Sequence, residues 1–208
     1  MRLIDISRGL SPATAVWPGD QTFEWTWTSR LKEGGSVNLG AITLSTHTGS
    51  HVDAPLHTRS EGANTSALEL ETFVGTAEVV DVREADTIRP SHVPSDPPAR
   101  VLFKTSASTL SKTEWPTRIA PIAPATVEVL TERNVDLIGT DAPSVDPLDS
   151  TTLPAHHALI EAGILNIEGL VLADVSPGRY SLLALPLKLE KADAAPVRAV
   201  LGEASLFG

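Results

Sequence analysis

The arrangement of apolar residues changes along the chain, and this change restricts the fold class more than any other feature of the sequence. In the first half, apolar and polar residues alternate, as in Phe23, Trp25 and Trp27 against Glu24, Thr26 and Thr28. Alternation with a period of two is typical of a strand with one buried face. Similar short runs predict further strands at residues 37–44, 77–82 and 101–104.

The second half of the sequence favours helix–strand units. A helix can begin at Pro124 and be closed by Asn134, and the apolar run 135–138 comes after it. A second helix can begin at Pro154 and end at Gly163, and residues 164–167 then follow as a strand. A β-rich first half followed by helix–strand units predicts an α/β fold.

The length of the chain and the spacing of its glycines and prolines indicate one folded unit. The chain has 208 residues, and its 16 prolines and 14 glycines are spread between short apolar runs. Four of these prolines lie within residues 89–100, which we interpret as a surface loop and not as a linker. We therefore expect residues 1–208 to form a single domain.

Charge and hydropathy exclude several classes of partner. With a formal net charge of −10, the sequence has no basic stripe for a nucleic acid or an anionic membrane. No run approaches the roughly 18 apolar residues that a membrane-spanning helix requires. The first residues, with Asp5 among them, do not resemble a signal peptide. These features predict a cytoplasmic enzyme.

The sequence contains no cysteine, so a metal ion would have to be held by nitrogen and oxygen ligands. Such ligands suit zinc, manganese, iron or cobalt. From six histidines in the chain, an average window of eleven residues would hold about 0.3, yet residues 47–57 hold three. A single histidine is more often an exposed loop residue, but three of them around Asp53 favour a metal site.

Gly49 and Pro55 predict the path of this segment. Gly49 allows a turn between His47 and His51, and Pro55 prevents a helix from continuing. We therefore expect a loop that leaves the strand at 37–44 and presents the ligands. In an extended segment His51 and Asp53 point to the same side. The two oxygens of Asp53 could then bridge two ions.

A second ion would need ligands from elsewhere, and His156 and His157 form the other pair of histidines in the sequence. On the predicted helix His156 shares its face with apolar residues, whereas His157 shares its face with Glu161, so we expect His156 to point inward. Glu168 ends an apolar strand and is a further candidate ligand, because an acid is rarely buried without a partner. The alternative for Glu168 is an exposed residue at the end of a strand.

The eleven residues 47–57, HTGSHVDAPLH, closely resemble the signature H-x-G-T-H-x-D-x-P-x-H of the cyclase-like metal hydrolases. Ser50 stands where threonine is usual and keeps the hydroxyl. The resemblance extends over nearly the whole chain, to DIS at 5–7, WPGD at 17–20, GTDAPSVD at 139–146 and the stretch 156–168. Within this family the chain most resembles the bacterial formamidases.

This resemblance implies an α/β fold of the swivelling β/β/α type and a homodimer or larger homo-oligomer. It also implies two divalent metal ions per subunit, with zinc as the first candidate and manganese as the alternative. One ion would be held by His47, His51 and Asp53, and the other by Asp53, His156 and Glu168. His57 would be the acid–base residue, and Asp141, Ser144 and Asp146 would support the site.

Trp17 resembles the aromatic residue that lies against the substrate ring in this family, and the alternative is an ordinary core tryptophan. The activity that the resemblance implies is that of an arylformamidase. With water activated by the metal, it would hydrolyse the formamide of N-formyl-L-kynurenine to L-kynurenine and formate in tryptophan degradation.

Two alternatives to this activity stay open. The nearer one is another amide or lactam hydrolase of the same family, such as an isatin hydrolase. The other is a non-catalytic metal-binding protein, which would have no use for His57. A serine hydrolase with a Ser-His-Asp triad is disfavoured, because the sequence has no G-x-S-x-G motif.

Overall fold

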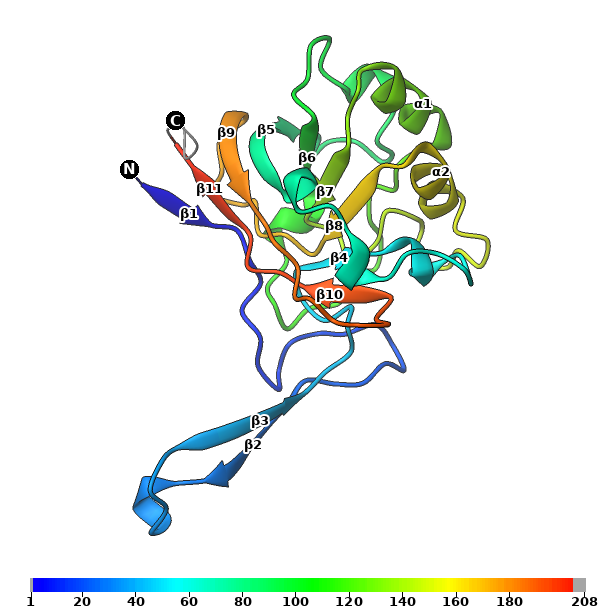
Figure 1. Cartoon of the computed structure of the whole chain (residues 1–208). Coiled ribbons are helices and arrows are strands. Elements are labelled where there is room, and N and C mark those ends of the chain that lie inside the picture. The colour runs from blue at the N-terminus through cyan, green and yellow to red at the C-terminus, as the bar shows by residue number, and fades with distance from the viewer. Residues whose placement is uncertain (1, 204–208) are drawn as a thin grey trace.

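The computed structural model describes residues 2–203, which form one mixed sheet, two α-helices on one face of it, and a projecting hairpin (Figure 1). Across the nine-stranded sheet the order is β1 (Leu3–Asp5), β11 (Val200–Gly202), β9 (Gly178–Leu183), β5 (Val74–Asp81), β6 (Arg100–Lys104), β7 (Leu137–Thr140), β8 (Leu165–Glu168), β4 (His51–Asp53) and β10 (Ala194–Pro196). The central strands β5 to β8 are parallel, and the outer pairs are antiparallel. The first and last described strands, β1 and β11, therefore lie side by side.

The two helices connect parallel strands, which cannot be joined by a tight turn. Helix α1 (Pro124–Glu132) links β6 to β7, and α2 (Pro154–Ala162) links β7 to β8. The remaining helical turns are short 3₁₀ segments at Leu31–Glu33, Pro55–His57, Thr65–Ala67, Leu70–Phe73, Pro90–His92 and Ser106–Thr109. Within residues 2–203 no helix combines the length and the apolar composition needed to cross a membrane.

The parallel part of the curled sheet is covered on both faces. Val101 and Phe103 of β6 pack in one core cluster with Leu130 of α1 and Leu159 of α2. The residue between them, Leu102, belongs to a second cluster on the opposite face, with side chains of β4, β8, β9 and β11. Burial on both faces explains why the three central residues of β6 are all apolar and do not alternate with polar ones.

The helix–strand units predicted from the sequence are confirmed. Helix α1 begins at Pro124, and Asn134 lies just after it with a φ of 55°. Helix α2 begins at Pro154 and is closed by Gly163 with a φ of 74°. Strands β3 (Leu39–Thr43), β5 and β6 occupy the positions where alternation predicted strands. The α/β class is therefore confirmed.

The segment 47–57 differs from the prediction. We expected a loop, but His51–Asp53 forms strand β4, which lies between β8 and β10. Gly49 makes the expected turn with a φ of 73°, whereas Pro55 opens a 3₁₀ turn after a strand and does not stop a helix. All three residues of β4 are buried and two of them are polar, so hydropathy could not reveal the strand.

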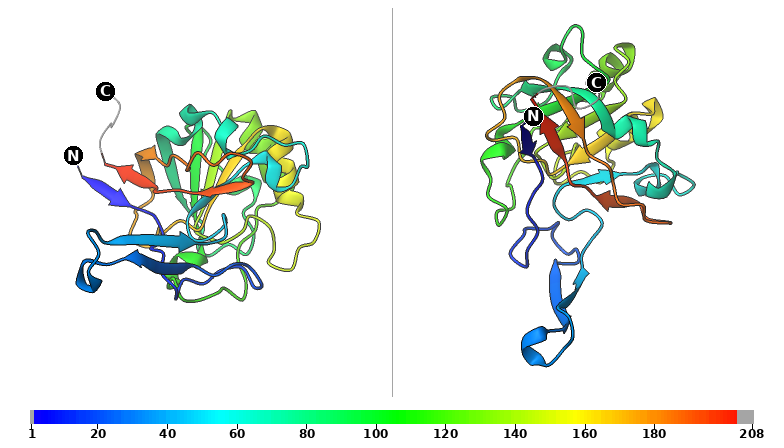
Figure 2. Two further views of the ribbon diagram at one scale, coloured as in Figure 1. Left: turned by 60° about the horizontal axis from the view of Figure 1, so that its bottom comes forward. Right: turned by 60° about the vertical axis from the view of Figure 1, so that its left-hand side comes forward.

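Strand β2 (Glu24–Ser29) pairs only with β3, and the two form an arm that projects from the body (Figures 1 and 2). Trp25 and Trp27 lie on one side of β2, with ring centroids 5.4 Å apart. Ile42 lies opposite Trp25 in β3. These three side chains are 47%, 45% and 54% exposed. The alternation in this part of the sequence thus predicted the strand correctly but not a buried face within the subunit.

Candidate metal centre

The register of β4 against β8 gathers four polar side chains on one face of the sheet. His51 lies opposite Glu168, and Asp53 lies opposite Asn166. The apolar residues between them point to the other face and into the core, because successive residues of a strand alternate. Asn166 Nδ2 donates to Asp53 Oδ2 at 2.7 Å and to Glu168 Oε1 at 3.1 Å. All four side chains are buried, and the asparagine holds the two carboxylates next to each other.

Helix α2 brings His156 onto this face. Its Nε2 lies 3.4 Å from Asp53 Oδ2 and 3.3 Å from Glu168 Oε1. His156 is buried and His157 is exposed, in agreement with the helical-face argument.

The other oxygen of Asp53 faces two further imidazoles. His47 Nδ1, in the turn before β4, lies 3.1 Å from Asp53 Oδ1, and His51 Nε2 lies 3.4 Å from the same oxygen. The two oxygens of Asp53 therefore face different sets of nitrogen atoms. A carboxylate in this position can contact two cations.

Each of these three imidazoles has its second ring nitrogen fixed by an oxygen. His47 Nε2 lies 2.9 Å from Asp193 Oδ2. His51 Nδ1 lies 3.1 Å from the carbonyl oxygen of Gly49, and His156 Nδ1 lies 2.7 Å from Asp146 Oδ2. An oxygen partner on one nitrogen fixes the tautomer and leaves the other nitrogen as an electron-pair donor. In all three residues, that free nitrogen is the one that faces Asp53.

Two buried atoms at the centre of the cluster have no hydrogen-bond partner. They are His51 Nε2 and Asp53 Oδ1. An unpaired buried polar atom is costly, and two such atoms facing each other at 3.4 Å indicate a missing partner common to both. A cation satisfies both atoms. The donor set, imidazole nitrogen and carboxylate oxygen, also suits a divalent cation.

The protonation equilibria show the same need for positive charge. Burial lowers the pKa of His47, but Asp53 and Asp193 outweigh this effect and raise the pKa to about 9. Burial likewise lowers the pKa of His156, but Asp146, Asp53 and Glu168 raise it to about 12. Burial opposes ionisation of Asp53, whose pKa the surrounding imidazoles nevertheless hold well below its usual range. Without a cation, protons on the imidazoles balance the carboxylates.

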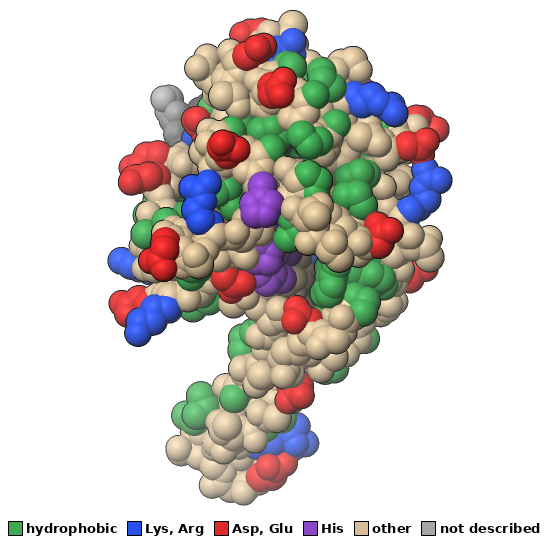
Figure 3. Space-filling model, turned by 90° about the vertical axis from the view of Figure 1, so that its right-hand side faces the viewer, with side chains coloured by type: hydrophobic (Ala, Val, Ile, Leu, Met, Phe, Trp, Pro, Cys, Tyr) green, Lys and Arg blue, Asp and Glu red, His purple; other side chains and the backbone are tan. Residues whose placement is uncertain are grey.

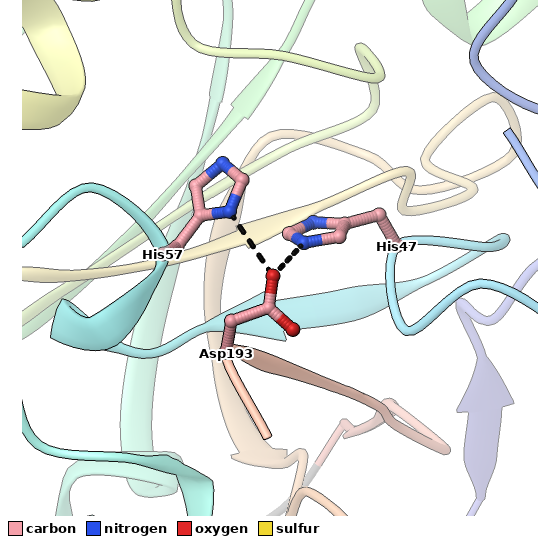
Figure 4. A group of neighbouring side chains, drawn as sticks. All are labelled: His47, His57 and Asp193. Carbon is pink, nitrogen blue, oxygen red and sulfur yellow. Dashed lines mark hydrogen bonds and ion pairs between the residues drawn. The ribbon is translucent and has the colours of Figure 1, made fainter. Parts of the chain in front are cut away.

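His57 lies at the edge of this cluster and not at its centre. Its ring centroid is 4.3 Å from that of His47 and 5.6 Å from that of His156. Its Nδ1 lies 3.4 Å from Asp193 Oδ2, and the same oxygen contacts His47 (Figure 4). Ligand atoms of His57 also fall in two of the three groups of side chains that are close enough to hold one ion. Its position alone thus allows both a ligand and an acid–base residue.

The cluster opens into a cavity of about 680 Å³ that His47, His51, His57, His156 and Glu168 help to line. Figure 3 shows histidine side chains gathered around a hollow on one face of the molecule. Trp17 lines the cavity of its own subunit and makes an edge-to-face contact with Trp115, with ring centroids 5.3 Å apart. A cavity of this size holds a ligand of one or two rings.

The loop after β7 supports the cluster from behind. Asp146 accepts hydrogen bonds from the backbone amides of Ala155 and His156 and therefore fixes the first turn of α2. Asp141 accepts hydrogen bonds from the backbone amide of Thr105 and, at 2.5 Å, from the Thr105 hydroxyl. Burial raises the pKa of Asp141 to about 6. Ser144 Oγ accepts from the amide of Asp146. Of these three residues, Asp146 touches the cluster directly, because its Oδ2 lies 2.7 Å from His156 Nδ1.

Three residues of the site were missed in the sequence. Asp193 precedes a strand of small residues, Asn166 lies inside an apolar strand, and Trp115 lies in a loop. A polar amide in an apolar run was the one available signal, and it pointed to Asn166. The other two have no local pattern, because only the tertiary structure brings them to the cavity.

Comparisons with known proteins agree with the fold. The family model described as "Putative cyclase" matches residues 4–147. A kynurenine formamidase of Salinibacter ruber is 60% identical over 209 residues, which cover 98% of this chain and 99% of the relative.

Two solved structures extend this similarity. One, described as a "predicted metal-dependent hydrolase" from Bacillus stearothermophilus, is 30% identical with a TM-score of 0.82, over 96% of this chain and 97% of the other. Isatin hydrolase A from Labrenzia aggregata is 25% identical with a TM-score of 0.80, over 96% and 93% of the two chains.

Proposed function

The chain belongs to the cyclase family, and from this membership we propose that it hydrolyses N-formyl-L-kynurenine to L-kynurenine and formate. The observation that carries the proposal is the cluster around Asp53, which opens into a cavity large enough for the substrate. The 60% identity to a kynurenine formamidase supports the choice of substrate.

The side chains present fit two divalent cations, with zinc as the first candidate and manganese as the alternative. His47, His51 and Asp53 would hold one cation, and Asp53, His156 and Glu168 would hold the other. Divalent cations bound there supply Lewis acidity, which polarises a carbonyl group and makes water a better nucleophile at neutral pH. The two unpaired atoms and the opposed oxygens of Asp53 support this arrangement.

His57 would move the proton that the departing aryl amine needs. Its Nδ1 faces Asp193, which leaves Nε2 as the ring nitrogen free to exchange a proton with the substrate. Imidazole is the side chain best suited both to accept and to donate a proton near neutral pH. The role is assigned to His57 because the other three histidines near the cavity have their free nitrogens directed at Asp53.

The rest of the cavity matches the remaining groups of N-formylkynurenine. Trp17 and Trp115 form an aromatic wall that can pack against the substrate ring. Arg8 lines the cavity and makes no ion pair within residues 2–203; its one side-chain hydrogen bond goes to the carbonyl oxygen of Ser111 at 3.4 Å. Asp141 acts on this guanidinium at longer range, and the guanidinium can still complement the α-carboxylate of an amino-acid substrate.

An isatin hydrolase activity is the second candidate, since the fold and the cavity would serve a cyclic amide as well. The identity of 25% to an isatin hydrolase, against 60% to a formamidase, favours the linear formamide. A side-by-side assay of formate release from N-formylkynurenine and of ring opening of isatin tests the choice. Faster turnover of isatin would replace our assignment by the second candidate.

The arm supports the proposal of a homodimer or larger homo-oligomer. A two-stranded hairpin is marginal by itself in water, and this one exposes Trp25, Trp27 and Ile42 on one face. Both ends of the arm reach the cavity, because Asp20 and Ser45 line it and are joined by a hydrogen bond of 2.7 Å. A second subunit that covers the arm would therefore also stabilise the rim of the cavity. A cytoplasmic location stays a prediction from the sequence.

A further inference from the structure

Asp193 occupies a fixed position beside the metal centre. It directly precedes β10, and Ala194 lies opposite Asp53 in the pairing of β10 with β4. The backbone amide of Ala54 donates to the carbonyl oxygen of Asp193 at 2.8 Å. The sheet therefore sets the position of the Asp193 backbone relative to the strand that carries His51 and Asp53.

The carboxylate of Asp193 contacts both a candidate ligand and the candidate acid–base residue (Figure 4). Its Oδ2 lies 2.9 Å from His47 Nε2 and 3.4 Å from His57 Nδ1. Its Oδ1 accepts the hydroxyl of Thr46 at 3.0 Å, which keeps Oδ2 directed at the two imidazoles. For His57 this is the one side-chain hydrogen bond within residues 2–203.

We propose that Asp193 is a positioning residue, which orients His47 toward the metal centre and His57 toward the substrate through one shared oxygen. The inference rests on the proposed function for the role of His57, but the part that concerns His47 does not depend on the substrate.

The physical effect of this shared contact follows from the two ring nitrogens of each histidine. A carboxylate that accepts from His47 Nε2 makes Nδ1 the electron-pair donor, and Nδ1 is the atom 3.1 Å from Asp53. The same carboxylate at His57 Nδ1 leaves Nε2 for proton exchange and limits rotation of the ring. Loss of a carboxylate behind a ligand histidine typically costs about 10- to 100-fold in metal affinity or activity.

A direct ligand role is the competing explanation. Ligand atoms of His47, His57 and Asp193 lie within 4.8 Å of one another, close enough to hold one ion. The two explanations differ in the number of bound cations, because a positioning residue changes affinity and a ligand changes stoichiometry. Measuring both quantities separates them.

The test compares the variants Asp193→Ala and Asp193→Asn with the control Glu190→Gln, an exposed acid of the same segment without a hydrogen bond or ion pair in the described structure. Zinc stoichiometry and zinc affinity are measured by chelator competition, and kcat and KM for N-formylkynurenine are measured at saturating zinc. The Asn variant keeps an acceptor oxygen, and it provides a second measurement if the Ala variant does not fold.

We expect both Asp193 variants to bind as many zinc ions as the wild type, with affinity lowered by about 10- to 100-fold in the Ala variant and by less in the Asn variant. At saturating zinc, kcat should fall by a similar factor while KM changes by less than about 3-fold, since Asp193 orients His57 and does not bind the substrate. In a His57→Ala background, Asp193→Ala should lower kcat further by less than about 3-fold. The Glu190→Gln variant should match the wild type.

Two results would overturn the inference. Loss of one bound zinc ion in the Asp193 variants would make this residue a ligand. Zinc affinity and kcat equal to those of Glu190→Gln would show that the contact does nothing. Failure of the proposed function would look different. A wild-type protein that binds zinc without releasing formate would contradict the proposed function, but the zinc affinities of the variants could still be compared.

Discussion

His51 lies directly opposite Glu168 in the antiparallel pairing of β4 with β8, and its Nε2 is 3.5 Å from Glu168 Oε2. The two residues are far apart in the sequence, so the hydrogen-bonded ladder of the sheet sets their separation. A metal centre built on such a ladder is held more rigidly than one built on a loop. His47 from the turn before β4 and His156 from α2 complete the cluster.

Substitutions of His51 and His57 should separate metal binding from catalysis. His51→Ala removes a buried nitrogen at the centre of the cluster, so both bound metal and formate release should be lost. His57→Ala should keep the metal and lower kcat by about 10²- to 10⁴-fold, the usual contribution of a general acid–base residue. Metal content by mass spectrometry and kcat on the same samples check this. The exposed His157→Ala is the matched control, and loss of metal from the His57 variant would place that residue among the ligands.

Substitutions of Asp53 and Glu168 should show whether one carboxylate serves two cations. Glu168→Gln should lower the metal content from two cations per subunit to one, because Glu168 is proposed to hold only the cation that it shares with Asp53 and His156. Asp53→Asn should abolish both, because each of its oxygens faces a different set of nitrogens. Native mass spectrometry counts the ions directly. Equal losses in the two variants would contradict a bridging role for Asp53.

The metal-free protein should lose stability as the pH rises. The pKa values of His47 and His156 in the folded protein, about 9 and about 12, lie above the ordinary value of 6.5. A raised pKa means that protonation favours the folded state, so the contribution is complete below pH 6.5 and is lost at higher pH, for His47 by about pH 9. Thermal unfolding of the chelated protein should therefore give a lower Tm at pH 9 than at pH 6.

The variant His47→Gln should show a smaller difference between the two pH values, while His157→Gln should show the wild-type difference. An equal or higher Tm at pH 9 for the chelated wild type would contradict the charge balance described for the cluster.

The exposed face of the arm should carry the contact between subunits. Replacing Trp25 and Trp27 by serine removes two large apolar side chains that are about half exposed and contact each other. Exposed side chains contribute little to the stability of the subunit, so the double variant should still fold. It should dissociate at concentrations at which the wild type is associated. Sedimentation at several concentrations measures this. A monomeric wild type would exclude the proposed homo-oligomer.

Much of the candidate metal centre could be predicted from the sequence because its candidate ligands are chemically unusual in their places. Three histidines around Asp53, an inward histidine on a helix and an acid at the end of an apolar strand all stood out against their neighbours. The structure brings these side chains together, and it also corrects the predicted loop at 47–57 to a strand. The reason for the error is that two polar residues on a buried face hide the apolar pattern of β4.

The remaining parts depend on contacts that no local pattern contains. Strand β10 has three small residues, so neither its pairing with β4 nor the position of Asp193 could be inferred from hydropathy. The same holds for the last strands, β9 and β11, which return the chain to a β-rich pattern after the helix–strand units. The alternating sequence of the arm predicted a buried face, but within residues 2–203 this face stays exposed.

Metal content and formate release, measured on one sample of the purified protein, test the central claim most directly. We expect two divalent cations per subunit, release of formate from N-formylkynurenine, and loss of this activity on chelation with recovery when zinc is added back. Formate release that persists after complete removal of metal would contradict the account, as would a protein that binds no divalent cation at all.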